Sequence, residues 1–228
     1  MNFPILSSLI ILPTIGALFL LFSKDKNSNT GKYVALFTSF VNFSISIYLW
    51  YLFDSSTSNF QFIENREWLK GFVNYKVGID GISILFIILT TFITPLCIIS
   101  VNNSVKIRLR DFLIAILVME SLMIGVFCSL DLVIFYLFFE AGLIPMFLII
   151  GIWGGTRRVY AAFKFFLYTL LGSVLMLVAI ISIYWLAGTT DIIQLYELGI
   201  DIKYQNLLWL AFFSSFAVKT PMWPFHTW

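Results

Sequence analysis

Long apolar runs separated by short polar clusters dominate the pattern of this chain. A continuous run of about 20 apolar residues crosses a bilayer as a helix, whereas a membrane β-barrel would need alternating segments of about ten residues. The runs here are continuous, so the pattern predicts an all-α integral membrane protein with about seven transmembrane helices. The expected spans are residues 3–22, 33–53, 79–100, 112–129, 132–152, 160–187 and 206–219.

The composition excludes a water-soluble protein. Of the 228 residues, 60% are hydrophobic and 11% are charged, against roughly 25% charged residues in an average soluble domain. The lipid bilayer is therefore an expected partner, and a net charge of +2 is too small for a nucleic-acid binder driven by phosphate contacts. Cys97 and Cys128 lie in apolar runs without Cys-x-x-Cys spacing, which predicts packing residues and neither a disulfide framework nor a metal site.

No internal repeat and no low-complexity linker divides the chain, which predicts a single membrane domain over residues 1–228. The first apolar run has no basic residue before it and no cleavage site after it, so it is expected to be a retained helix. The outer loop 54–78 carries Tyr and Val in its segment 72–78, and a β-hairpin is expected there. Residues 191–197 place apolar side chains at helical spacing, which favours a short interfacial helix.

Basic residues indicate the side of each short loop, because loops rich in Lys and Arg stay on the cytoplasmic or matrix side. The first, third and fifth loops are the basic ones, whereas the sixth contains one basic residue, Lys203. The amino terminus and the loop 54–78 are therefore expected on the outer side. The basic residues of the three odd-numbered loops are Lys24, Lys26, Lys32, Lys106, Arg108, Arg110, Arg157 and Arg158.

Three ionisable residues, Glu120, Glu140 and Lys219, fall near the middle of predicted spans. A charge at that depth costs roughly 2.5–3.5 kcal/mol on insertion scales, so these residues indicate function, although a Glu–Lys pair can also tie helices together. Pro145 follows Glu140, and Pro221 follows Lys219, so the seventh helix is expected to be broken near Lys219–Pro221. Broken helices beside ionisable residues are typical of ion pathways in transporters.

A buried glutamate and lysine can act together as a proton switch. Lysine keeps its proton beside the acid and can release it when the two separate, whereas arginine does not lose its proton. Moving one charge against 100 mV costs about 2.3 kcal/mol, so the switch needs an energy source. The chain has no phosphate-binding loop, dinucleotide fingerprint, cysteine cluster or histidine pair, which predicts no redox chemistry of its own. The single histidine, His226, is either structural or a proton relay.

Four motifs resemble the antiporter-like subunits of respiratory complex I. Phe-Glu140-Ala-Gly-Leu-Ile-Pro-Met resembles the fifth-helix glutamate motif of that family. Phe-Ala-Val-Lys219-Thr-Pro-Met-Trp-Pro-Phe-His226-Thr-Trp resembles its seventh-helix signature. Gly78-Ile-Asp-Gly-Ile-Ser83 and Lys164-Phe-Phe-Leu-Tyr-Thr169 resemble the start of its third helix and its sixth helix. The motifs occur in the order of the family, and the resemblance covers essentially the whole chain.

The resemblance implies the first part of a fourteen-helix fold and proton translocation driven by electron transfer from NADH to quinone. By position, Glu140 matches the essential glutamate and Lys219 the pumping lysine, while Glu120, Lys164 and His226 match further relay positions. The implied partners are the other membrane subunits of complex I, including neighbouring antiporter-like subunits. NAD, FMN, iron–sulfur clusters and quinone would lie in partner subunits, with no cofactor in this chain. The implied location is a bacterial inner (cell) membrane or, alternatively, the mitochondrial inner membrane.

Other functions fit parts of the same pattern. A subunit of a multisubunit sodium/proton antiporter or of a membrane-bound hydrogenase would share the motifs. A structural membrane scaffold would tolerate charge-neutral replacement of the buried Glu and Lys. A seven-helix receptor fits the helix count alone and leaves these two residues without a role. The sequence ends at Trp228, inside the seventh-helix motif, which predicts an N-terminal fragment of a longer protein over a truncated paralogue that cannot pump.

Overall fold

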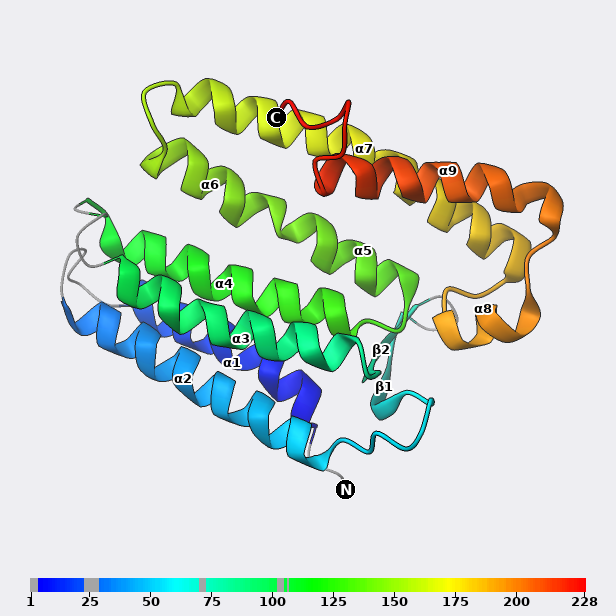
Figure 1. The fold of residues 1–228 in the computed structure, drawn as a ribbon, viewed down its shortest axis with the longest axis horizontal. Helices are drawn as coiled ribbons and strands as arrows, with labels where there is room; N and C mark the ends of the chain where they lie inside the picture. The colour runs from blue at the N-terminus through cyan, green and yellow to red at the C-terminus, as the bar shows by residue number, and fades with distance from the viewer. Residues whose placement is uncertain (1–3, 23–28, 70–72, 102–104, 106) are drawn as a thin grey trace. The chain divides into compact units, whose positions relative to one another are not determined.

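Helices dominate the computed structural model, which describes residues 4–22, 29–69, 73–101, 105 and 107–228 (Figure 1). Within these residues, six helical segments are long and apolar enough to cross a membrane, and one two-stranded sheet is present. The predicted class, a helical multi-pass membrane protein, is confirmed. The six segments are α1 (Ile5–Phe22), α2 (Asn29–Leu52), α3 (Ser83–Ser100), α4 (Leu109–Cys128), the stretch Leu132–Trp153 and α7 (Arg158–Ala187).

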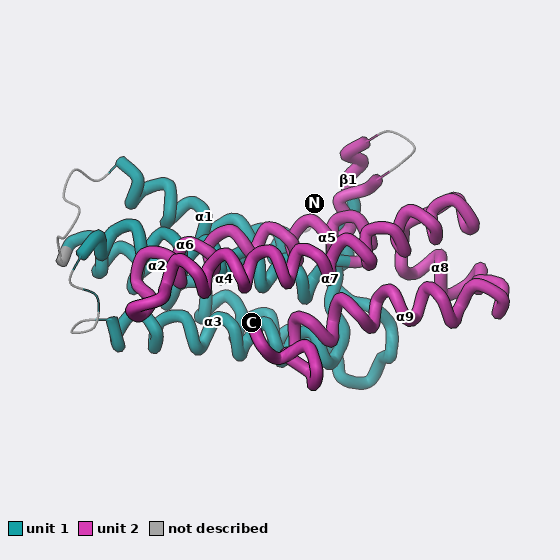
Figure 2. The backbone as a smooth tube through the Cα atoms, turned by 90° about the horizontal axis from the view of Figure 1, so that it is seen from above, with its two compact units in different colours: residues 1–65, 77–129 teal, residues 66–76, 130–228 magenta. Residues whose placement is uncertain are grey.

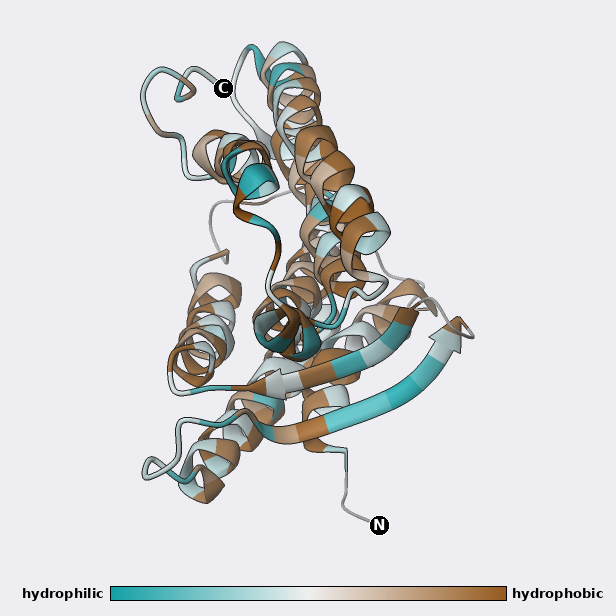
Figure 3. Ribbon diagram, turned by 90° about the vertical axis from the view of Figure 1, so that its right-hand side faces the viewer, coloured by the Kyte–Doolittle hydropathy of each residue, from teal (hydrophilic) through white to brown (hydrophobic). Residues whose placement is uncertain are grey.

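The chain folds into two compact units (Figure 2). Unit 1 is formed by the described residues of 1–65 and 77–129, and unit 2 by those of 66–76 and 130–228. In both units large apolar side chains face outward, as Phe22 and Trp185 do with 86% and 89% exposure. Figure 3 shows hydrophobic colours over much of the length of the helices. Such surfaces are typical of a protein whose surroundings are lipid.

Unit 1 is a four-helix bundle with a partly polar interior. Helix α1 packs on α2 and α4, and α3 packs on the same two helices. On α2, Ser39, Asn42 and Ser46 lie at helical spacing on one face and are fully buried. The hydroxyl oxygens of Ser46 and Thr91 of α3 are 2.7 Å apart. Hydrogen bonds of this kind join helices in a membrane, where apolar burial gives no driving force. The apolar part of this core is Ala17, Leu20, Ala35, Ile98, Leu113 and Leu117.

Helices α1 and α2 approach each other closely at Gly16. A Cβ atom at this position would lie 2.6 Å from Cγ2 of Thr38, whose hydroxyl donates to the carbonyl oxygen of Val34. We expect Gly16→Ala to lower the free energy of unfolding by about 1–3 kcal/mol, the usual cost of overpacking. Thermal unfolding in detergent, followed by circular dichroism, measures this change. Gly81→Ala is the control, since a Cβ there meets no atom within 4 Å, and equal melting temperatures would contradict the close packing.

The connection between α2 and α3 contains a hairpin of β1 (Gln61–Leu69) and β2 (Val73–Ile79), in the segment where the sequence predicts one. Glu64 of β1 reaches the start of α1. One of its carboxylate oxygens accepts the N–H of Leu6 at 2.9 Å, and the other accepts that of Ser7 at 3.2 Å. Because the first N–H groups of a helix lack partners within the helix, Glu64 serves as a cap for α1.

Asp80 fixes the start of α3. Its carboxylate accepts the backbone N–H of Ser83 at 2.7 Å and that of Ile82 at 3.2 Å, together with the hydroxyl of Ser83 at 2.7 Å. Burial alone would raise the pKa of Asp80, but these hydrogen bonds outweigh it and hold the pKa below its usual value. The motif Gly78–Ser83 is thus a helix-capping element.

Unit 2 contains α7 with the four helices α5 (Leu132–Ala141), α6 (Leu143–Trp153), α8 (Ile192–Leu198) and α9 (Ile202–Lys219). Helix α7 packs along α6 and α9. The seventh predicted span, 206–219, forms the later part of α9, which begins four residues earlier. Its first turns carry the polar residues Lys203, Gln205 and Asn206. Helix α9 is not among the six segments that are long and apolar enough to cross a membrane. The short helix predicted over 191–197 corresponds to α8.

A junction of three chain segments anchors the start of α5. Asp131 and Asp191 are the N-cap residues of α5 and α8, and each accepts backbone N–H groups of its own first turn. Nζ of Lys76 lies 2.5 Å from Oδ2 of Asp191, and the Thr190 hydroxyl donates to Asp131 at 2.7 Å. Backbone hydrogen bonds from Leu130 to Lys76 and from Leu132 to Thr190 join the same segments. This junction therefore fixes the end of α5 opposite to Glu140.

The orientation of the chain across the bilayer stays a prediction. Lys24, Lys26 and Lys106, on which it partly depends, lie outside the described residues.

Candidate functional site

Glu140 lies beside a break in the fifth membrane segment. The sequence predicts one helix over 132–152, whereas the structure has two, α5 and α6, separated by Gly142. Pro145 accounts for the break, because it has no N–H to donate to the carbonyl of Ala141 and its ring clashes with that carbonyl. Pro145 therefore leaves the Ala141 carbonyl without a partner inside the helix, whereas the N–H of Gly142 still donates to the carbonyl oxygen of Phe138 at 3.3 Å.

The carboxyl group of Glu140 is enclosed by protein. Both of its oxygens are shielded from solvent, and neither accepts a hydrogen bond from a residue that the structure describes. Ser173 of α7, whose hydroxyl donates to the carbonyl oxygen of Leu170 at 2.9 Å, and Lys219 of α9 influence this carboxyl electrostatically. Ser215, one turn before Lys219, is buried, and its hydroxyl also has no partner among the described residues. Because buried polar groups are nearly always hydrogen-bonded, these atoms mark a place that can bind a proton or water.

The ammonium group of Lys219 is held by Phe139, the residue before Glu140. Its Nζ donates to the carbonyl oxygen of Phe139 at 2.8 Å and lies 3.6 Å from the centroid of the Phe139 ring. This carbonyl belongs to the last turn of α5, and the face of an aromatic ring attracts cations. The break after Glu140 therefore provides the acceptor that positions Lys219.

Helix α9 ends at Lys219, so the break predicted near Lys219–Pro221 is present. The carbonyl groups of its last turn find partners in the residues that follow. The N–H groups of Thr220 and Met222 donate to two of them at 2.8 and 2.9 Å. The indole of Trp228 donates to a third, that of Val218, at 2.8 Å. Three backbone carbonyl groups at this end of the helix therefore have hydrogen-bond partners within the protein, as irregular backbone inside a membrane requires.

Glu140 and Lys219 meet at one place but do not form a closed ion pair. The lysine binds the Phe139 carbonyl, and neither carboxylate oxygen of Glu140 has a hydrogen-bond partner in the described structure. A glutamate and a lysine this close influence each other's protonation, and their separation can change with a small movement. The arrangement is suited to proton exchange between the two groups.

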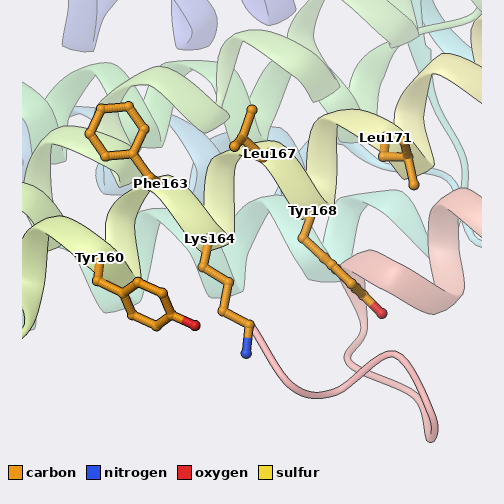
Figure 4. Close-up of a pocket in the computed structure, with 6 residues that line it drawn as sticks. All are labelled: Tyr160, Phe163, Lys164, Leu167, Tyr168 and Leu171. Atoms are coloured by element: carbon orange, nitrogen blue, oxygen red, sulfur yellow. The ribbon is translucent and has the colours of Figure 1, made fainter.

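Lys164 lies on α7 beside an open groove of about 400 Å³ (Figure 4). Its ammonium donates to the carbonyl oxygen of Thr227 at 2.6 Å and so binds the segment that follows α9. His226, in the same segment, is exposed. Lys164 of α7 therefore contacts the segment that follows α9 and that contains His226. The groove is lined by Tyr160, Phe163, Lys164, Leu167, Tyr168 and Leu171.

Glu120 lies in unit 1, on α4, with 2% of its surface exposed. The side-chain amide of Asn42, on α2, donates to its Oε1 at 2.8 Å. The sequence alone does not single out Asn42, Ser173 or Ser215. In the sequence each of them is only a small polar residue within an apolar span, and such residues are common at helix contacts in membranes. Among the described residues, no group of three or more His, Cys, Asp or Glu side chains could hold a metal ion.

Membrane helices with two breaks beside a buried glutamate and lysine are an arrangement typical of ion-translocating membrane proteins. A family model described as NADH:quinone oxidoreductase/Mrp antiporter, TM, matches residues 129–228. The chain is 56% identical over 217 residues to NADH-quinone oxidoreductase subunit M of Rhodobacter capsulatus, covering 90% of this chain and 41% of the relative. It is 48% identical over 225 residues to NADH-ubiquinone oxidoreductase chain 4 of Marchantia polymorpha, covering 98% and 46%.

The chain is therefore a homologue of subunit M and of chain 4, and it spans a little under half the length of these relatives. A chain of respiratory complex I from Thermus thermophilus with bound NADH matches it with a TM-score of 0.84 at 29% identity, over 98% of this chain and 45% of that chain. A chain of an archaeal membrane-bound sulfane sulfur reductase has a TM-score of 0.80 at 20% identity, over 96% and 34%, and shows the fold alone. The structure matches the N-terminal portion of the antiporter-like fold.

Proposed function

We propose that this chain belongs to a proton-translocating membrane subunit of an NADH:quinone oxidoreductase. The observation that carries the proposal is the meeting of Glu140 and Lys219 at two helix breaks within the membrane part of the chain. The identity of 56% to a subunit M supports it. A structural scaffold would need no ionisable groups at these two positions, because the insertion of such groups into a membrane is unfavourable.

The proposed energy source is electron transfer in partner subunits, which would hold NAD, FMN, iron–sulfur clusters and quinone. The proposed partners are the other membrane subunits, including neighbouring antiporter-like subunits. The proposed location is a bacterial inner membrane, and relatives named chain 4 make the mitochondrial inner membrane the alternative. This chain would contribute proton-binding groups and no redox centre.

The proposed proton transfer uses the movable pair of Glu140 and Lys219. While Lys219 is held at Phe139, the enclosed Glu140 carboxyl favours the neutral form and takes up a proton. When the ammonium approaches Glu140, the ion pair favours loss of that proton from the acid. When the pair opens again, the lysine can release its own proton, which an arginine could not do. Lys164, His226 and Glu120 are proposed as further relay groups.

Membrane vesicles from a host that lacks its own copy of the full-length subunit test this function. Expression of the full-length protein that contains this chain should restore NADH-driven proton uptake, followed with a pH-sensitive dye, together with NADH:quinone activity. The family model is shared with Mrp antiporters, so sodium is varied as well. Proton movement that requires sodium and is independent of NADH would favour a sodium/proton antiporter and contradict the proposal.

A further inference from the structure

The pair formed by Glu120 and Asn42 in unit 1 has two buried atoms without partners. Asn42 is fully buried, and Glu120 is 2% exposed. One contact joins them, from Nδ2 of Asn42 to Oε1 of Glu120 at 2.8 Å. The remaining oxygens, Oδ1 of Asn42 and Oε2 of Glu120, are shielded from solvent and have no hydrogen-bond partner in the described part of the chain. Among the described residues of unit 1, they are the only two buried side-chain nitrogen or oxygen atoms without a hydrogen-bond partner.

Both unpartnered atoms are acceptors when the carboxyl is ionised. A carboxylate oxygen and an amide oxygen cannot bond to each other, and a buried acceptor without a donor is unfavourable. A single proton on Oε2 changes this, because the neutral acid is a donor. A carboxylic acid and a primary amide can then bind through two hydrogen bonds, one from Nδ2 to Oε1 and one from Oε2 to Oδ1.

Nearby polar groups do not supply the missing donor. The Ser121 hydroxyl, next to Glu120, donates to the carbonyl oxygen of Ile10 on α1. Ser46, one turn beyond Asn42, is joined to Thr91, and Ser39 donates to the carbonyl of Leu36. Among the described residues, these contacts leave the Glu120–Asn42 pair as the one place in the interior of unit 1 where a donor is required.

Among the described residues of unit 1, no cation is placed to neutralise an ionised Glu120. The helices packed against α4 are α1, α2 and α3. Helix α1 has no ionisable side chain, and Cys97 of α3 is exposed. Lys32 of α2 is ten residues from Asn42, and Arg110 of α4 is ten residues from Glu120, a rise of about 15 Å in each case. The other ionisable groups of these four helices are Tyr33, Tyr48, Tyr51, Asp111 and Cys128.

We propose that Glu120 and Asn42 form a proton-binding site, in which Glu120 is a neutral carboxylic acid at neutral pH with its proton on Oε2, directed to Oδ1 of Asn42. The ligand is the proton itself. The site joins α4 to α2 through two hydrogen bonds and removes a charge that the bilayer would disfavour. It lies in unit 1 and does not depend on the function proposed for Glu140 and Lys219.

Infrared difference spectroscopy of the full-length protein in lipid tests this site. A neutral carboxylic acid has a C=O stretching band that is separate from the bands of a carboxylate and shifts on exchange into deuterated water. The spectrum of the wild type minus that of Glu120→Gln, at neutral pH, should contain one neutral-acid band, because the variant lacks this group. Glu197→Gln, at an exposed residue of α8, is the matched control and should remove carboxylate bands only.

Asn42→Ala provides an independent measurement. It keeps the acid and removes its partner, so the neutral-acid band should stay but shift to higher frequency, because the hydrogen bond to its C=O group is lost. If Glu120→Gln prevents folding, this shift decides the question by itself. Loss of carboxylate bands in Glu120→Gln, or an unchanged neutral-acid band in a folded Asn42→Ala protein, would overturn the proposal.

Discussion

Glu140→Gln is expected to lower NADH-driven proton pumping by about tenfold or more when the full-length subunit is present in the assembled complex. Glutamine has nearly the same size and fits the enclosed position at the end of α5. It cannot take up and release a proton, however, and groups positioned for proton transfer contribute roughly 10²–10⁴-fold in rate. Pumping is measured in membrane vesicles with a pH-sensitive dye, and NADH oxidation with an artificial acceptor reports whether the redox part still works.

The matched control for this change is Glu197→Gln on α8, where the side chain is exposed and the same chemical substitution is made. This control should pump at the wild-type rate. Native electrophoresis establishes that both variants assemble. Undiminished pumping by an assembled Glu140→Gln complex would show that the carboxyl is a structural group, as a scaffold would allow.

The sequence locates Glu140 and Lys219 because charges are rare in apolar spans and because each is followed by a proline. It cannot locate the contact of Lys219 with Phe139, since these residues are 80 positions apart and their contact depends on how α9 packs in unit 2. The same holds for Asn42 and Glu120, which are 78 positions apart. Spacing along one helix is readable from the sequence, whereas contacts between helices are set by packing.

Hydropathy also misses breaks within a span. The segment 132–152 is apolar on both sides of Gly142, so its hydropathy is that of one helix, although the backbone is interrupted there. Gly142 and Pro145 are the local signs of this interruption, but glycine is tolerated within helices and proline can kink a helix without ending it. The start of α9 is the opposite case, because a helix extends into polar residues that hydropathy assigns to a loop. The Asp201 side chain caps this start by accepting the N–H of Lys203 at 3.0 Å.

Lys219→Arg is expected to lower proton pumping nearly as much as Lys219→Ala, by about tenfold or more, if the lysine must release its proton. Arginine keeps the positive charge and binds carbonyl oxygens and aromatic faces at least as well, so it would preserve a purely structural contact with Phe139. It does not deprotonate in proteins, so it cannot serve as a proton donor. The dye assay in vesicles separates these roles, with Lys203→Arg at an exposed site of α9 as the control. Pumping at the wild-type rate in an assembled Lys219→Arg complex, together with a loss in Lys219→Ala, would assign Lys219 an electrostatic or structural role and remove proton release from the mechanism.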